Sequence, residues 1–171
     1  FIKNSGAAGI AASLSFTALP AMAKYKNISS FNFGAGTPFQ QQPLPYAYNG
    51  LEPVIDAMTM ELHYSKHAAT YAKNLAEACA AENVKTDAMK LEDVLAKISS
   101  YTPKMRNNGG GHYNHELFWK SMAAPNSTEL KGKLKTAIEQ SFNSVDEFKT
   151  KFADAARSRF GSGWALLVLT K

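Results

Sequence analysis

The sequence has little of what several common classes of protein require. It holds a single cysteine, Cys79, so no internal disulfide can form, and the lack of a cysteine cluster argues against a structural zinc finger. No Gly-x-Ser-x-Gly elbow and no P-loop occur in the 171 residues, which removes the simplest hydrolase and nucleotide-binding classes. Charged residues make up only 19% of the chain, without a Lys/Arg stripe interleaved with aromatics. Nucleic acid is therefore not an expected partner.

The composition that remains is typical of a globular protein of one sizeable domain or two small ones. Hydrophobic residues make up 45% of the chain, and the net charge is +5. Basic residues are spread through helical segments beside acidic ones, as on a solvated face. The mild positive field of such a surface attracts a small anionic substrate.

An apolar, uncharged stretch occupies residues 4–23 and ends in Ala21-Met22-Ala23. This A-x-A pattern favours a targeting peptide, although the length also allows a weak membrane-spanning helix or an apolar arm. The expected location is an organelle, plastid or mitochondrion, with membrane association through this stretch as an alternative. Glycine and proline break the polar segment that follows, so we expect residues 1–42 to form a leader and linker.

Helical periodicity predicts three helices in the next part of the chain. The first starts near Pro53 and runs to about Ala81, the second covers 91–99, and the third covers 112–122 after a run of three glycines. The apolar residues at helical spacing on the first helix are Val54, Ile55, Met58, Leu62, Tyr64 and Tyr71. Together these helices predict a helical hairpin domain over residues 43–124.

The chain changes character after this domain. Asn126 and Ser144 each stand three residues before a glutamate, which predicts two capped helix starts, the second helix running to Arg159. After a Gly-Ser-Gly break, residues 164–169 form an apolar run of strand length. We therefore expect an α+β fold, in which the helical hairpin is followed by the first helices and first strand of an incomplete α/β domain, residues 125–171.

The four histidines fall in two short helical segments. His63, His67 and Tyr71 are spaced four apart, so they lie along one face of a helix, and His112 and His115 are three apart on another. Two helices that each present histidine inward are a common way to build a metal site. Imidazole nitrogen suits Zn, Mn, Fe, Cu or Ni. Spacing alone also leaves open a role for each ring as a hydrogen-bonded core or surface group.

Short sequence motifs add to this interpretation of the histidines. They resemble motifs of the iron/manganese superoxide dismutase family and occur in the same order along the chain. The matching words are Leu44-Pro45-Tyr46, Leu51-Glu52-Pro53, Glu61 to His67, Asn74-Leu75, Asn108 to His115, Phe118-Trp119, Phe148, Phe152 and Phe160 to Trp164. The resemblance implies a superoxide dismutase, which converts superoxide to oxygen and hydrogen peroxide at one Mn or Fe ion. It covers the chain from about Pro43 onward.

The resemblance also implies a role for individual residues. His63 and His115 match the family's first two metal ligands. His67 and Tyr71 match the pair that gates the substrate funnel and holds the proton relay. Glycine at position 111 resembles the manganese type. The residues that match the aromatic wall of the metal pocket are Trp119 and Trp164.

The family's other two ligands, an aspartate and a histidine, stand in a D-x-W-E-H motif that the 171 residues do not contain. We expect the polypeptide alone to be inactive, and favour its origin in a working enzyme. Since the same motif supplies contacts between subunits in the family, a homodimer at full length stays open. The alternative is a catalytically degenerate, dismutase-like structural subunit of a larger organellar membrane complex, docked through residues 4–23. Ala68 and Val54 also depart from the family, which frequently has histidine at both positions.

Overall fold

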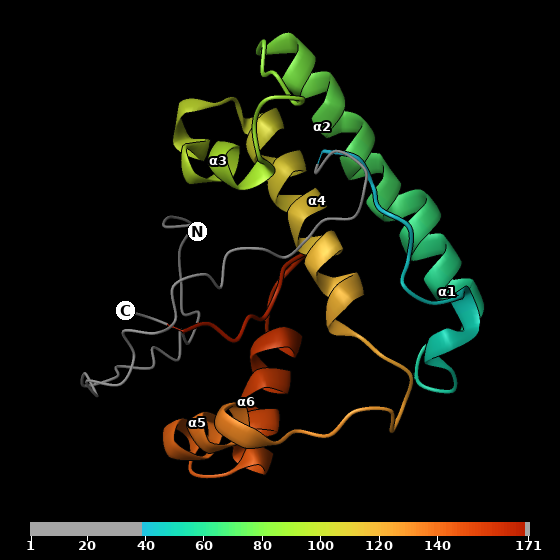
Figure 1. The fold of residues 1–171 in the computed structure, drawn as a ribbon, viewed down its shortest axis with the longest axis vertical. Coiled ribbons are helices and arrows are strands. Elements are labelled where there is room, and N and C mark those ends of the chain that lie inside the picture. The colour runs from blue at the N-terminus through green and yellow to red at the C-terminus, as the bar shows by residue number, and fades with distance from the viewer. Residues whose placement is uncertain (1–38, 170–171) are drawn as a thin grey trace. The chain divides into compact units, whose positions relative to one another are not determined.

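The computed structural model describes residues 39–169, and the regular elements that it assigns within them are helices (Figure 1). In chain order they are a 3-10 helix Tyr48–Leu51, α1 Ala57–Leu62, a π-helix His63–Ala68, α2 Ala69–Ala81, α3 Leu91–Ala96, a 3-10 helix Ile98–Ser100, α4 Pro103–Ser121, α5 Gly132–Phe142 and α6 Val145–Arg157. The described residues divide after Thr128 into two compact units.

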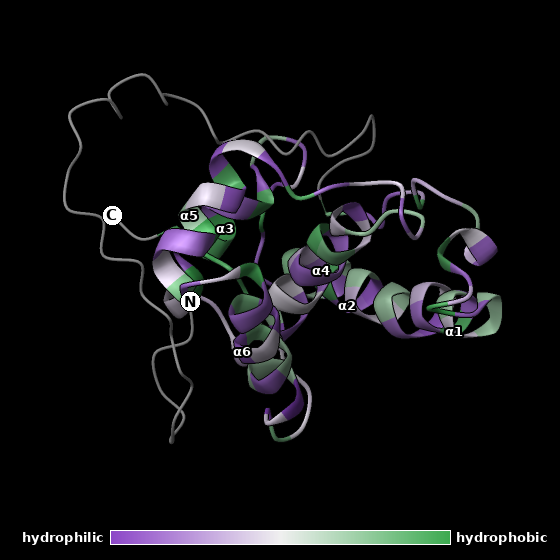
Figure 2. Cartoon of the chain, turned by 90° about the horizontal axis from the view of Figure 1, so that it is seen from below, coloured by the Kyte–Doolittle hydropathy of each residue, from purple (hydrophilic) through white to green (hydrophobic). Residues whose placement is uncertain are grey.

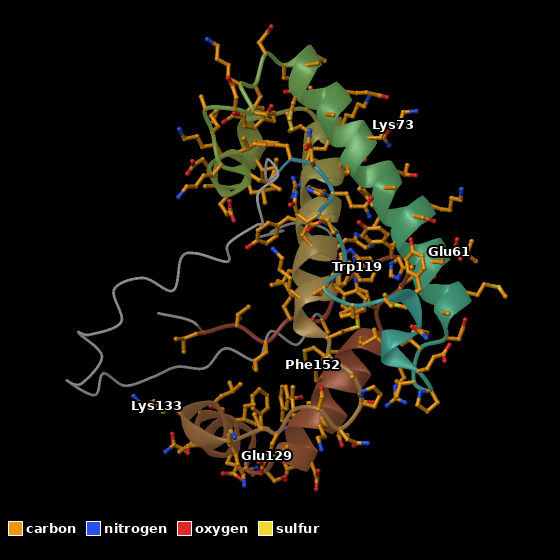
Figure 3. The ribbon with its side chains drawn as sticks, turned by 45° about the vertical axis from the view of Figure 1, so that its right-hand side comes forward. Glu61, Lys73, Trp119, Glu129, Lys133 and Phe152 are labelled. Carbon is orange, nitrogen blue, oxygen red and sulfur yellow. The ribbon has the colours of Figure 1, made fainter. Side chains whose placement is uncertain are left out.

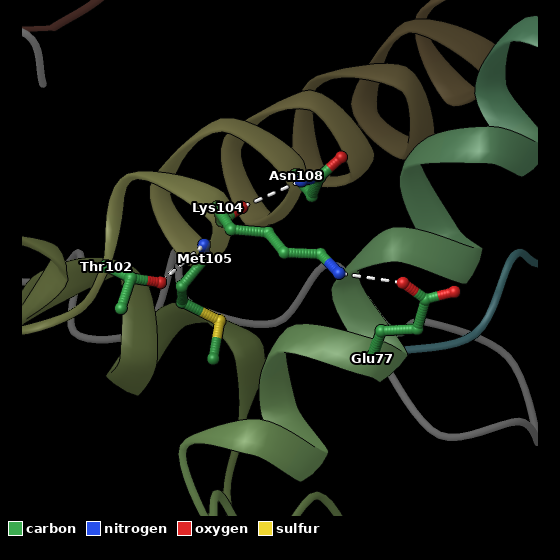
Figure 4. A network of polar contacts seen from close by, with 5 residues as sticks. All are labelled: Glu77, Thr102, Lys104, Met105 and Asn108. Carbon is green, nitrogen blue, oxygen red and sulfur yellow. Dashed lines mark hydrogen bonds and ion pairs between the residues drawn. The ribbon is translucent and has the colours of Figure 1, made fainter.

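Helices α2 and α4 run antiparallel and form the centre of the first unit (Figure 1). Between them and α3 lies an apolar core of buried side chains, namely Phe39, Leu75, Ala78, Cys79, Leu91, Val94 and Met105. Polar contacts join the same helices at the surface, where Lys104 Nζ lies 2.7 Å from Glu77 Oε2 (Figure 4). Cys79 is a small buried thiol in this core.

A second apolar cluster lies toward the other end of the hairpin, next to the histidines. Its buried members are Leu51, Met60, Ala68 and Trp119. Not all apolar residues that the periodicity places along the first predicted helix are buried. Val54, Met58 and Leu62 are 76%, 69% and 53% exposed. Met60, between them in sequence, is 1% exposed, because it faces α4 and Trp119.

The starts of two helices differ from the sequence-based expectation, and a side-chain cap is found at each observed start. The first helix begins at Ala57 instead of near Pro53, since the carboxylate of Asp56 accepts the backbone N–H of Thr59 at 2.8 Å. Helix α4 begins at Pro103, capped by Thr102, whose hydroxyl accepts the N–H of Met105 at 3.3 Å (Figure 4). The glycine run therefore lies inside α4 and does not precede it.

In the second unit, helices α5 and α6 pack through Phe142, Phe148 and Phe152. Figure 2 shows polar and apolar residues sharing the surface of both helices. The capped start at Ser144 is confirmed, since its hydroxyl accepts the N–H of Glu147 at 3.0 Å. The capped start at Asn126 is wrong: that residue has a φ of 60°, and the helix begins only at Gly132.

The run Trp164–Leu169, predicted to be a strand, is not part of a strand in the described chain. A strand exists only through hydrogen bonds to a neighbouring strand, and residues 39–169 contain no segment that pairs with it. The helical part of the predicted fold is thus observed, whereas its β part is not.

Among the described residues, no helix combines the length and the apolar character needed to cross a membrane. The stretch 4–23, on which the membrane and organellar predictions rest, lies outside the described residues.

Two neighbouring glycines in α4 have opposite surroundings. A Cβ added at Gly110 would meet no atom within 4 Å, whereas one added at Gly111 would overlap the ring of Tyr71. That ring cannot move aside freely, because it stacks on His115 with centroids 5.2 Å apart. Glycine is therefore required at position 111 by packing, and at position 110 it only weakens the helix.

We expect G110A to raise the free energy of unfolding by about 0.5–1 kcal/mol, since alanine favours a helix over glycine. We expect G111A to lower it by roughly 1–3 kcal/mol through overpacking. Urea denaturation of both variants measures the difference, and each serves as the control for the other. Equal shifts in the two variants would contradict the packing of Tyr71 against Gly111.

Candidate metal centre

Two histidine side chains from different helices meet in the hairpin unit. His63 is the first residue of the π-helix, and His115 lies in the second half of α4. Their Nε2 atoms are 3.1 Å apart, and the ring planes cross at 89°. Two nitrogen ligands at about 2.1 Å from one ion lie no more than about 4.2 Å apart, so the observed separation suits a shared ion.

A backbone contact decides which nitrogen of His115 carries the proton. Its Nδ1 lies 2.7 Å from the carbonyl oxygen of Gly111. Since a carbonyl oxygen only accepts, Nδ1–H donates, and Nε2 of the neutral ring keeps its lone pair. Metal-binding histidines are usually oriented in this way, by a hydrogen bond from the second ring nitrogen. The lone pair of His115 is thus available on the nitrogen that lies next to His63.

His67 and Tyr71 extend the cluster along the same helical run. One candidate ligand atom from each of His63, His67 and His115 lies within 4.8 Å of the others. The ring of Tyr71 lies 5.2 Å from the rings of both His67 and His115. His67 is exposed and His115 is buried, so the four side chains connect solvent to the interior of the hairpin.

The π-helix His63–Ala68 brings these side chains into line. In an α-helix of 3.6 residues per turn, four residues drift by about 40° around the axis, so Tyr71 would lie about 80° from His63. A π-helix, with i→i+5 bonds, turns less per residue and offsets part of this drift. The sequence spacing correctly predicted a shared face. It gave no indication of the π-helix, because the spacing of residues on one face does not distinguish i→i+4 from i→i+5 bonding.

Two aromatic side chains of α4 pack against the ring of His63. Trp119 is 2% exposed and its ring meets that of His63 edge-on at 5.0 Å. Figure 3 labels Trp119 on α4, in the region where the side chains of the hairpin gather. Phe118, which the sequence did not mark as a site residue, lies 6.0 Å from His63. Trp164 belongs to the second unit, and its role in the pocket wall stays a prediction.

Glu116 is a site residue that the sequence reasoning missed. It is 2% exposed, and its Oε1 accepts the backbone N–H of Gln42 at 3.1 Å. Burial raises the pKa of this carboxyl, while the Gln42 N–H and the charge of Lys120 act in the opposite direction. Helical spacing could have indicated its burial, because Glu116 lies four residues after His112 and three before Trp119, both buried.

Burial also affects the two candidate ligands. It lowers the pKa of His63, and the neighbouring rings of His115 and His67 lower it further. Burial lowers the pKa of His115 as well, against the opposing effect of its hydrogen bond to Gly111. Lower pKa values keep both imidazoles neutral at neutral pH, and only the neutral ring offers a lone pair to a metal ion.

Comparison with known families agrees with this geometry. Residues 38–123 match the family described as "Iron/manganese superoxide dismutases, alpha-hairpin domain". Residues 130–171 match "Iron/manganese superoxide dismutases, C-terminal domain". The chain belongs to the iron/manganese superoxide dismutase family, as the sequence words had indicated.

Individual relatives are bacterial proteins named as manganese superoxide dismutases. The one from Acinetobacter baylyi is 48% identical over 145 residues, which cover 83% of this chain and 62% of the relative. The one from Escherichia coli is 48% identical over 130 residues, with coverage of 74% and 62%. The one from Salmonella typhi is 50% identical over 131 residues, again with coverage of 74% and 62%. The chain thus spans 62% of the length of these relatives.

The lowered pKa values predict a pH-dependent stability of the metal-free chain. Between the folded pKa and the usual 6.5, the unfolded chain binds more protons at His63 and His115 than the folded chain does. Stability therefore rises with pH in this window and falls as the pH drops below 6.5. Urea denaturation midpoints are measured at several pH values. As the pH falls, the midpoint of the H63Q/H115Q double variant should decrease less than that of the wild type. If the midpoint of the variant depended on pH as strongly as that of the wild type, this would contradict the lowered pKa values of His63 and His115.

Proposed function

We propose that the hairpin unit supplies half of the metal centre of a superoxide dismutase, which converts superoxide to oxygen and hydrogen peroxide. The observation that carries the proposal is the 3.1 Å separation of the Nε2 atoms of His63 and His115, which come from different helices. Membership of the iron/manganese family supports this reaction, as do relatives named as manganese superoxide dismutases. Superoxide would be the substrate.

The metal would be Mn or Fe, held here by His63 and His115. The donor set fits such an ion, because two neutral imidazoles present Nε2 atoms that lie close together. A bound ion would supply electron exchange by alternating between its +2 and +3 states. Glycine at position 111 and the names of the relatives favour Mn.

His67 and Tyr71 would serve the movement of protons and the approach of substrate. Two superoxide ions and two protons give one molecule of oxygen and one of hydrogen peroxide, so protons must reach the site. The exposed imidazole of His67 lies against the Tyr71 ring, which stacks on His115. This row of side chains offers a path for protons from solvent, while Trp119 excludes water on the opposite side.

The remaining ligands are a separate part of the proposal. By resemblance they are the Asp and His of a D-x-W-E-H motif, which is absent from these 171 residues. A carboxylate offsets the charge of the oxidised metal, so two imidazoles alone make a poor redox site. We therefore propose that dismutation, and the homodimer contacts of a full-length protein, require this motif as well.

The domain assignment also stays a proposal, with residues 43–124 as the helical hairpin domain and 125–171 as the start of an α/β domain. The two family matches support a division near this point. Residues 1–42 would form a leader and linker. An organellar location and docking to a membrane complex would depend on residues 4–23, which lie outside the described chain.

The 171-residue chain alone is expected to show no dismutation at rates typical of superoxide dismutases, because it holds only two of the family's ligands. Joined to the part of the Acinetobacter relative beyond the matched region, it is expected to be active. Activity measurements and metal analysis on both proteins provide the test. Inactivity of the joined protein, with its metal in place, would overturn the proposed function, and activity of the chain alone would overturn the half-site interpretation.

Histidine variants of the joined protein distinguish the two proposed metal ligands from His67, which is proposed to serve substrate approach and proton movement. Changes to residues that only support a ligand typically weaken metal binding about 10–100-fold, so the loss of a ligand should cost more than about 100-fold. We expect this larger loss of Mn²⁺ affinity in H63Q and H115Q. H67Q should keep the affinity within about 10-fold while lowering the turnover rate. Equal metal loss in H67Q and H63Q would show instead that His67 is a third ligand.

A further inference from the structure

One short segment contacts both helices that carry the candidate ligands. Residues 39–46, here called the strap, precede the first helical turn and run along the hairpin (Figure 1). At one end Phe39 is 3% exposed and belongs to the core between α2 and α4. At the other end Leu44 and Tyr46 pack against the cluster that contains Trp119. The strap is therefore anchored at both ends by apolar contacts.

Between these anchors, a single residue of the strap bridges the two helices. The backbone N–H of Gln42 donates to Oε1 of Glu116 on α4 at 3.1 Å. The backbone carbonyl of Gln42 accepts the hydroxyl of Tyr64, on the π-helix, at 2.8 Å. Gln42 and Glu116 are 6% and 2% exposed, so water competes little for the bond between them.

The two partners of Gln42 each follow a candidate ligand in sequence, Tyr64 after His63 and Glu116 after His115. Further bonds reinforce the same connection. The side-chain amide of Gln41 donates to the Tyr64 carbonyl at 2.8 Å. The hydroxyl of Tyr46 donates to the Trp119 carbonyl at 3.0 Å.

We propose that Tyr64 and Glu116 are positioning residues of the metal centre, which hold the His63 and His115 rings at their observed separation by bonding to the Gln42 peptide. The proposal rests on the proposed function, because it takes these two histidines as ligands. Ligands must be held within about 0.5 Å of their working positions, which apolar packing alone does not ensure. Removing either side chain deletes one of the two hydrogen bonds that join its helix to the strap, so the strap is held less tightly.

The first test uses the metal-free chain and so does not depend on dismutation. Amide hydrogen exchange of the strap is compared in Y64F, E116L and E116Q. We expect exchange at least about 10-fold faster in Y64F and E116L, because each loses a bond to Gln42. E116Q keeps an acceptor oxygen and should stay close to the wild type. If E116L fails to fold, Y64F decides the outcome.

The matched controls are Y101F and E77Q. Tyr101 packs against the core that contains Phe39, but Y101F removes only its hydroxyl and keeps the ring. Glu77 joins α2 to α4 at the surface through Lys104. Both variants should leave exchange of the strap unchanged. Exchange in Y64F and E116L no faster than in these controls would overturn the proposal.

The second test measures Mn²⁺ affinity of the joined protein described above. Y64F and E116L should weaken binding about 10–100-fold, the range expected for residues that support a ligand, and E116Q should rescue most of the loss. The effects in the double variant should be less than additive, because both residues act through Gln42. Unchanged affinity in the single variants would overturn the positioning role. A wild type that binds no metal would instead overturn the proposed function, while the exchange experiment still decides whether Tyr64 and Glu116 hold the strap.

Discussion

The candidate site depends on one short distance, the 3.1 Å between the Nε2 atoms of His63 and His115. In the metal-free chain, Nε2–H of His63 donates to the lone pair on Nε2 of His115, and an ion bound between the rings would take the place of that proton. The surrounding fold supports this arrangement. Each helix provides this support differently: the π-helix turns the first ring, and a hydrogen bond to the Gly111 carbonyl orients the second.

Gly111 contributes to the site through two independent properties. Its carbonyl accepts Nδ1–H of His115, and its lack of a side chain makes room for the ring of Tyr71. A larger residue at this position would displace the ring that stacks on the candidate ligand. His115 and Tyr71, the candidate ligand and a member of the proposed proton path, are thus joined by a glycine that intrinsic helix preference would not select.

The buried polar groups around the site form a connected system. Glu116 would be costly to bury alone, but it receives the Gln42 N–H and lies near Lys120. Through Gln42 the same system reaches Tyr64 and hence the π-helix. Such a system rigidifies the hairpin more specifically than its apolar clusters, because hydrogen bonds depend on direction as well as distance.

Much of the candidate site could be predicted from local sequence. The spacing of His63, His67 and Tyr71 indicated one helix face, and Ser144 indicated a capped helix start. Both signals arise within one or two turns of a helix, so they need no knowledge of the rest of the fold. Sequence words in family order then identified the family and predicted two of its ligands in this chain.

Contacts between distant segments decided the rest. The exposure of Val54 and Met58, the bond between Gln42 and Glu116, and the missing strand at 164–169 all depend on what lies next to each segment in space. Periodicity shows which side of a helix is apolar but not what covers it. The sequence by itself therefore determined where most helical segments lie, though not where they begin, as well as the histidine spacing and the family. Only the tertiary structure decided how closely the rings approach and what holds them there, because residues 74 positions apart form the bond that joins the strap to α4.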